Sequence, residues 1–165
     1  HTEYGAAKAR TAEALSCIAG DTEASWAWGR VFFSFGPGEP EARLIPAILR
    51  AVAGKEPLGI GPGSTVRDFW HVRHLGAALA ALALSDATGP VNLSSGHGVS
   101  FADLAVMANG LAGADVISPD ARSLGPGEPE QLIGDATKLR EKVGFEPPEA
   151  LASDLKDYAA SITSV

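Results

Sequence analysis

A tyrosine and a lysine near the start of the chain have the types and the spacing of a proton-transfer pair. Tyr4 and Lys8 are four residues apart, so on a helix their side chains share one face. The Lys8 ammonium favours the ionised phenol and would lower the pKa of Tyr4 toward the range of a general acid or base. The pair therefore predicts proton transfer at an alcohol or sugar oxygen, coupled to hydride exchange with a nicotinamide. The alternative is a surface pair that stabilises a helix by roughly a few tenths of a kcal/mol.

The composition is that of a globular protein large enough to bury a core. The chain has 165 residues, of which 45% are hydrophobic and 20% are charged, both ordinary values. A net charge of −7 with scattered basic residues argues against a nucleic-acid or membrane-surface partner. The single cysteine, Cys17, excludes an internal disulfide and is expected to be a buried, inert thiol in a reducing compartment. The apolar run after Val72 is rich in alanine and ends at Asp86, so it does not read as a membrane span. We therefore expect a cytoplasmic protein.

Strand-like segments alternate with helical ones along the chain, which predicts an α/β protein. The apolar, aromatic run from Trp26 to Phe35 is typical of a buried strand, and it ends at the turn signal Gly36-Pro37-Gly38. Gly54 is expected to close the second helix, and Ser100 to cap the fourth. Helices are expected at residues 2–19, 44–52, 72–82, 101–111, just after 135, and at 151–162. Further strands are expected at 58–60 and 91–93, an extended segment at 68–72, and irregular structure over 112–134.

Motifs that follow one another along almost the whole chain carry a family resemblance. In order they are YGAAK at 4–8, a strand from Arg30 ending in FGPG at 35–38, ARLIPAILRAVAGKEPL at 42–58, VRDFWHV at 66–72, VNLSSG at 91–96 and GDATKLREKVGFEPPEAL at 134–151. Together they resemble the C-terminal half of an extended short-chain dehydrogenase/reductase, of the NAD-dependent epimerase/dehydratase family that modifies nucleotide sugars. The resemblance implies the C-terminal part of a Rossmann-like parallel sheet with a smaller mixed α/β substrate-binding domain. Residues 1–40 would end the dinucleotide-binding domain. Residues 41–165 would form mainly the substrate-binding part, with returns to the Rossmann sheet.

The resemblance also assigns the groups that would handle the cofactor, NAD or NADP. It implies that Tyr4 is the catalytic acid/base, while Lys8 holds the nicotinamide ribose and keeps the Tyr4 pKa low. Val31 and Phe32, at the end of a strand, would lie against the nicotinamide. The reaction would be an epimerisation, a dehydration or a ketone reduction on a nucleotide-activated sugar, and the visible motifs do not choose between them.

The same resemblance implies where a nucleotide sugar would bind. Arg67, expected to be exposed beside the Gly61-Pro62-Gly63-Ser64 loop, would pair with the diphosphate. Asn92 would donate its side-chain amide to the same region. Four residues would border the nucleotide base: Arg43, Leu44, Leu58 and Ile60. Two alternatives stay open, since Arg67 and Asp68 could form an ion pair that orders a loop, and Asn92 could bond the backbone of a turn.

Three positions depart from the family pattern. Phe33 stands where many members have an asparagine that touches the diphosphate or the sugar, so we include it among the candidate substrate-binding residues. Phe35 replaces the usual tyrosine before Gly-Pro, and Gly125 takes the place of a second phosphate-binding arginine. Val72-Arg73-His74 also replaces the Val-Asp-Asp that usually opens the following helix. Two other hypotheses therefore stand beside the enzyme: a non-catalytic dinucleotide-binding scaffold or sensor, and a reductase of a non-nucleotide substrate.

The Gly-rich phosphate turn and the catalytic serine or threonine expected of the family do not occur among the 165 residues. We expect both to lie in a missing N-terminal half, without which this chain would be inactive, and a homodimer is plausible by resemblance. His71, His74 and His97 do not supply a convincing ligand set, so no metal is expected.

Overall fold

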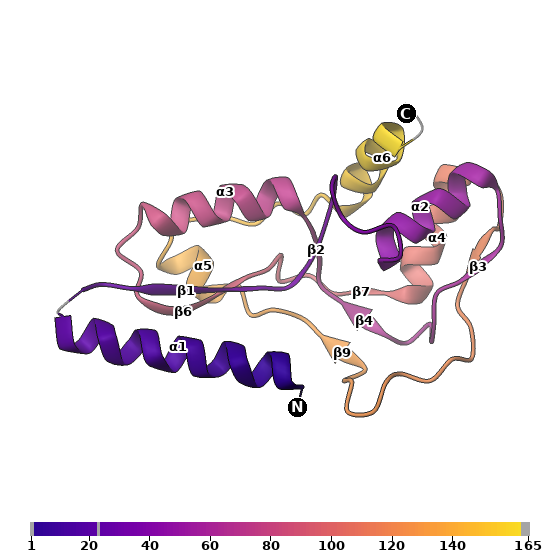
Figure 1. Cartoon of the computed structure of the whole chain (residues 1–165). Coiled ribbons are helices and arrows are strands. Elements are labelled where there is room, and N and C mark those ends of the chain that lie inside the picture. Colours follow the sequence, from indigo (N-terminus) through magenta and orange to yellow (C-terminus); the bar gives the residue numbers. More distant parts are fainter. Residues whose placement is uncertain (1, 23, 163–165) are drawn as a thin grey trace.

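The chain pairs with one strand up to Val31 and with a different strand from Phe33 onward. This change of partner at Phe32 organises the β structure (Figure 1). In the computed structural model, which describes residues 2–22 and 24–162, β1 (Ala27–Val31) pairs in parallel with β6 (Gly89–Leu93). Directly after Phe32, β2 (Phe33–Phe35) pairs in parallel with β5 (Phe69–His71). Phe32 itself donates its backbone N–H to the Leu93 carbonyl at 3.2 Å. The single strand expected over 26–35 is therefore two short strands in two different sheets.

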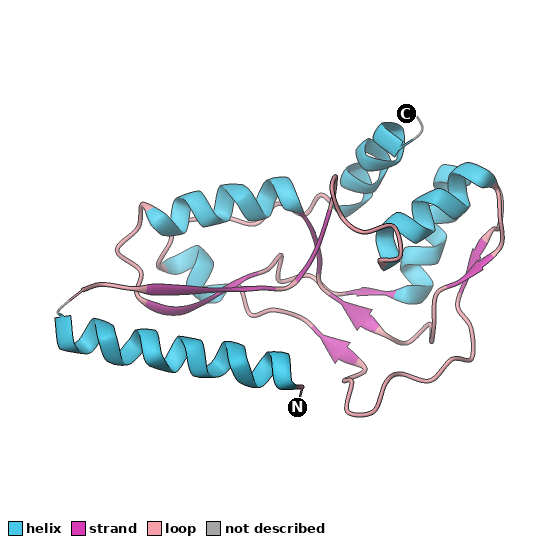
Figure 2. Ribbon diagram, viewed as in Figure 1, coloured by secondary structure: helices cyan, strands magenta, loops and turns pink. Residues whose placement is uncertain are grey.

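The remaining strands are short and lie beyond the switch at Phe32 (Figure 2). β3 (Leu58–Gly59) is parallel to β8 (Ile117–Ser118). β4 (Val66–Arg67) is the middle strand of three, antiparallel to β7 (Val99–Ser100) and parallel to β9 (Gln131–Leu132). The long loop between β8 and β9 lies within the segment predicted to be irregular.

All six expected helices form. They are α1 (Glu3–Thr22), α2 (Leu44–Gly54), α3 (Val72–Ala83), α4 (Phe101–Ala112), α5 (Thr137–Glu141) and α6 (Leu151–Ile162). Ser100 caps α4 as predicted, since its Oγ accepts from the Asp103 N–H at 3.0 Å. The end of α2 differs from the prediction: Gly54 stays helical and Lys55 takes the left-handed conformation, with φ 53°. The Lys55 backbone N–H donates to the carbonyls of Ala51 and Val52 in the last turn, a role that a glycine N–H often fills. No helix in the described part of the chain is long and apolar enough to cross a bilayer.

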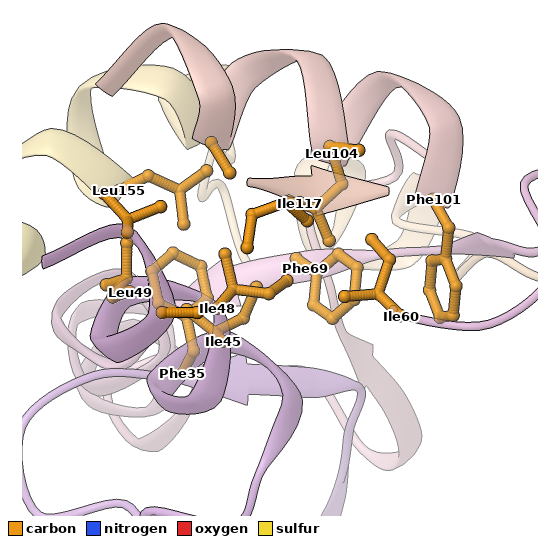
Figure 3. Close-up of a cluster of buried hydrophobic side chains, with 14 of the residues drawn as sticks. Phe35, Ile45, Ile48, Leu49, Ile60, Phe69, Phe101, Leu104, Ile117 and Leu155 are labelled. Atoms are coloured by element: carbon orange, nitrogen blue, oxygen red, sulfur yellow. The ribbon is translucent and has the colours of Figure 1, made fainter. Parts of the chain in front are cut away.

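Two hydrophobic clusters form the core, and β5 contributes to both. Successive side chains of a strand point to opposite faces, so Phe69 enters one cluster and Trp70 the other. In the first cluster, Ile45, Ile48 and Leu49 of α2 face Leu104 of α4 and Leu155 of α6 (Figure 3). The second cluster lies between α3, α5 and β6. β5 thus holds the β1–β6 pair and the α2–α4–α6 unit together.

β1 and α1 are more exposed than the sequence indicates, whereas Val91 and Leu93 of the paired strand β6 are fully buried. α1 and α3 lie on opposite sides of the β1–β6 pair (Figure 1), and Ala19 is the one buried residue of α1 among those described. Cys17 is exposed, so the expectation of a buried thiol was wrong. Val31 is also exposed, and β1 is not the buried strand that its apolar run predicted. The reason is that, within the described residues, β1 has β6 as its one strand neighbour.

A buried carboxylate ties the segments together at the switch. Asp68, which lies between β4 and β5, is fully buried. Its Oδ1 accepts from the Ser95 N–H at 3.0 Å and the Ser95 hydroxyl at 2.6 Å. Its Oδ2 accepts from the N–H groups of Gly96 at 2.9 Å and Gly134 at 3.1 Å. Four donors on one buried carboxylate satisfy its charge without a cation.

Asp68→Asn is expected to lower the free energy of unfolding by about 3 kcal/mol, because an amide offers one acceptor oxygen to four donors and leaves buried N–H groups unpaired. Denaturant unfolding of the complete protein measures this, with the exposed Asp115→Asn as the matched control. A loss as small as that of the control would contradict the anchoring role of Asp68.

His71 caps α3 through a ring nitrogen. Its Nδ1 accepts from the Arg73 backbone N–H at 3.1 Å, and the ring packs edge-on against Phe35 and Tyr158. Burial lowers the pKa of His71 below its ordinary 6.5; the carboxylates of Asp154 and Asp157 oppose this effect, and Arg73 and His74 add to it. The cap requires the neutral ring, since a protonated Nδ1 cannot accept.

Because the folded pKa of His71 lies below the unfolded value, the unfolded state binds more protons just under pH 6.5. The free energy of unfolding is therefore expected to fall as the pH drops from 7.5 to 5.5. His71→Asn keeps a capping acceptor and does not titrate in this range, so its stability should depend less on pH. Unfolding curves at several pH values test this, and equal slopes for both proteins would refute it.

Candidate functional site

Arg67 is held at the centre of the site by β4, the middle strand of its sheet. It is 2% exposed, against the expectation of an exposed loop arginine. Its Nη1 donates to the carbonyls of Val66 at 2.8 Å and Glu130 at 3.0 Å, and its Nη2 to Glu128 Oε1 at 2.7 Å. The guanidinium also lies over the Phe33 ring, 5.5 Å from its centroid. The acid paired with Arg67 is Glu128, whereas the neighbouring Asp68 bonds the loop after β6.

A cavity of about 220 Å³ opens beside Arg67 at the place where the chain changes strand partner. Four residues predicted to contact substrate line it: Phe33, Arg43, Leu44 and Arg67. The carboxyl ends of parallel strands next to such a switch are the usual position of ligand sites in α/β sheets. The structure thus brings together residues from β2, α2 and β4 that are distant in sequence.

A second hollow, of about 430 Å³, adjoins this cavity. Leu44, Phe101 and Glu128 line both spaces, and Leu58 and Ile60 line the second. The residues predicted to border a nucleotide base therefore lie around two neighbouring hollows.

The predicted pair on α1 shares one helix face. The Lys8 Nζ lies 5.5 Å from the centroid of the Tyr4 ring, and Tyr4 is 73% exposed. α1 runs antiparallel to β1, so its Tyr4 end points toward the carboxyl end of that strand (Figure 1). Val31 and the half-buried Phe32 lie at this same strand end.

Asn92 is placed differently from the other candidates. It lies on β6 opposite Arg30, and its Nδ2 donates to the Asp135 carbonyl at 3.0 Å. It does not line either hollow. The observed bond is of the backbone kind that the sequence left open as the alternative role of this residue.

Glu39 and Glu128 were not among the residues predicted to bind substrate, yet both line the 220 Å³ cavity. The signal for Glu128 was its position after the Gly125-Pro126-Gly127 turn, which folds the chain back over Arg67. The hydrogen bond from Arg67 lowers the pKa of Glu128 below the ordinary value of a glutamate. Within residues 2–22 and 24–162, no three His, Cys, Asp or Glu side chains gather as metal ligands would.

Comparison with known proteins gives this arrangement its class. The chain is 25% identical to the UDP-N-acetylglucosamine 4-epimerase of Methanobrevibacter ruminantium, solved with UDP-N-acetylmuramic acid, at a TM-score of 0.85 over 98% of this chain and 53% of the other. It is also 25% identical to MoeE5, solved with UDP-glucuronic acid and NAD, at a TM-score of 0.73 over 86% and 48%. A UDP-glucose 4-epimerase of Lactobacillus helveticus is 29% identical over 131 residues, 70% of this chain and 38% of that protein. The chain therefore has the fold of the extended short-chain dehydrogenases/reductases, and the predicted α/β class is confirmed.

The model of the GDP-mannose 4,6 dehydratase family matches residues 1–157, and the chain belongs to this family. It spans about half the length of the solved relatives and a smaller share of the curated one.

Arg67→Met is expected to lower the free energy of unfolding by about 3 kcal/mol, because it leaves two carbonyls and the Glu128 carboxylate without their donor. Glu128→Gln should lower the free energy of unfolding by less than about 1 kcal/mol, because the Glu128 side chain is 47% exposed and water can take the place of its carboxylate beside Arg67. Denaturant unfolding of the two variants and the wild type gives both values. Equal losses would mean that the ion pair, and not the carbonyl contacts, fixes Arg67.

Proposed function

We propose that this chain carries the catalytic helix and the substrate-binding part of an NAD(P)-dependent enzyme acting on a nucleotide-activated sugar. The observation that carries the proposal is the Tyr4–Lys8 pair, which shares one helix face. The amino-terminal end of α1 points toward the carboxyl end of β1 (Figure 1). The reaction is an epimerisation, a dehydration or a ketone reduction. All three share one proton and hydride exchange at a sugar carbon.

The residues near the Tyr4 end of α1 fit a nicotinamide nucleotide. Val31 and Phe32 offer an apolar surface for the ring, and the Lys8 ammonium offers donors for a ribose. The cofactor, when bound, accepts or donates hydride. Tyr4 takes the hydroxyl proton as the sugar carbon is oxidised to a ketone, and returns a proton to that oxygen when the ketone is reduced.

The hollows around Arg67 are the proposed substrate site. The Arg67 guanidinium, with Arg43 at the cavity wall, supplies the positive charge for a diphosphate. Leu44, Leu58 and Ile60 provide apolar contacts for the base. Relatives that are named for a UDP-sugar, or that were solved with one bound, support this assignment. Asn92 is proposed to contribute through its bond to Asp135, which fixes the segment after β9.

The proposal includes a dinucleotide-binding unit outside these 165 residues, because the Gly-rich turn and the catalytic serine or threonine do not occur among them. The division into residues 1–40 and 41–165, the homodimer and the inactivity of this chain alone stay predictions. Purified residues 1–165 that turned over substrate would contradict the last.

Tyr4→Phe in the complete protein is expected to lower kcat by a factor of about 10² to 10⁴, the usual contribution of a positioned acid/base group. Binding of NAD(P) and of a UDP-sugar should remain, since the ring is kept. Initial rates with NAD(P) and UDP-glucose measure the effect, with Arg10→Lys on the same helix as the control. Unchanged turnover in Tyr4→Phe would refute the proposed role. A wild type that binds cofactor without any turnover would favour the scaffold or sensor.

A further inference from the structure

The Glu128 carboxylate takes two hydrogen-bond donors that a phosphate group can also use. Its Oε1 accepts from Arg67 Nη2 at 2.7 Å, and its Oε2 accepts from the Gly125 backbone N–H at 3.3 Å. Guanidinium and backbone N–H groups are common donors to the oxygens of carboxylates and phosphates. The chain therefore supplies an anion of its own to the donors beside the 220 Å³ cavity.

Arg67 is almost fully covered while Glu128 is in place. Its side chain is 3% exposed, its Nη1 is taken by the carbonyls of Val66 and Glu130, and the Phe33 ring lies against the guanidinium. The carbonyls and the ring belong to the packed interior of the fold. The Glu128 side chain, by contrast, is 47% exposed. Among these groups, Glu128 is therefore the one that an incoming anion can displace.

The segment that carries Glu128 is held to the rest of the fold at few points. Residues 123–129 are exposed, apart from the half-buried Leu124. Gly125 and Glu128 bond each other and close a turn. Among the described residues, the bond from Arg67 is the one hydrogen bond that joins this segment to another part of the chain. Glu128 can therefore leave Arg67 without breaking other contacts of that kind, and its carboxylate is solvated at little cost.

We propose that Glu128 is a built-in competitor for the phosphate site, which holds Arg67 and the Gly125 N–H in the free protein and yields them to the diphosphate of a nucleotide sugar. This inference rests on the proposed function, because it takes the diphosphate to bind at Arg67. A diphosphate carries more charge and more acceptor oxygens than one carboxylate, so it wins the exchange. A ligand without phosphate does not displace Glu128. Access to Arg67 thus depends on the diphosphate.

The test measures the dissociation constants of UDP and of uridine by calorimetry, with the complete protein loaded with NAD(P). Glu128→Gln keeps the size of the side chain and removes its charge, so it should bind UDP about three- to tenfold more tightly than the wild type, because the competing state is less populated. Uridine has no phosphate and should bind both proteins equally. Glu130→Gln is the matched control, since Glu130 is exposed and lines neither hollow. It makes the same charge change two residues away and keeps the backbone carbonyl that Arg67 uses, so it should change the UDP affinity by less than about twofold.

The two ligands and the two variants separate the possible results. UDP binding to Glu128→Gln that is no tighter than to the wild type would overturn this inference and leave the proposed function standing. An equal gain in Glu130→Gln would also overturn it, because the gain would then be a general effect of charge. Weaker binding of uridine to Glu128→Gln would do the same, because Glu128 would then contact the nucleoside itself. If neither the wild type nor Glu128→Gln binds UDP, the proposed function is contradicted, and this inference with it.

Discussion

Four hydrogen bonds to the buried Asp68 carboxylate connect three segments that are far apart in the sequence. Asp68 stands between β4, which holds Arg67, and β5, which joins the two hydrophobic clusters. Its donors come from the loop after β6 and from Gly134 after β9. The position of Arg67 therefore depends on the Asp68 contacts, because both residues belong to the same short extended segment.

The change of strand partner at Phe32 explains why the site lies where it does. β1 and β6 end at this point, and β2 carries the chain to a different sheet. Phe33 and Ser34, the first residues of β2, line the cavity that Arg67 borders. A topological switch at the carboxyl ends of parallel strands is a general location for ligands in α/β proteins. The Tyr4 end of α1 points toward the same end of β1.

Charge pairing is the main electrostatic property of this site. Each of its two arginines bonds a glutamate of the same cavity, and the bond from Arg67 lowers the pKa of Glu128. An anionic ligand at Arg67 would therefore compete with Glu128 for the same guanidinium.

Local patterns in the sequence determined the six helices, the Ser100 cap and the shared face of Tyr4 and Lys8, since each depends on residues within a turn or two of one another. The motif order was enough to predict the family. Only the tertiary structure decided that Arg67 is buried against Glu128, 61 residues away, that Asp68 bonds backbone rather than Arg67, and that the apolar β1 is exposed. These depend on which distant segments meet, and the types and spacing of neighbouring residues do not specify that.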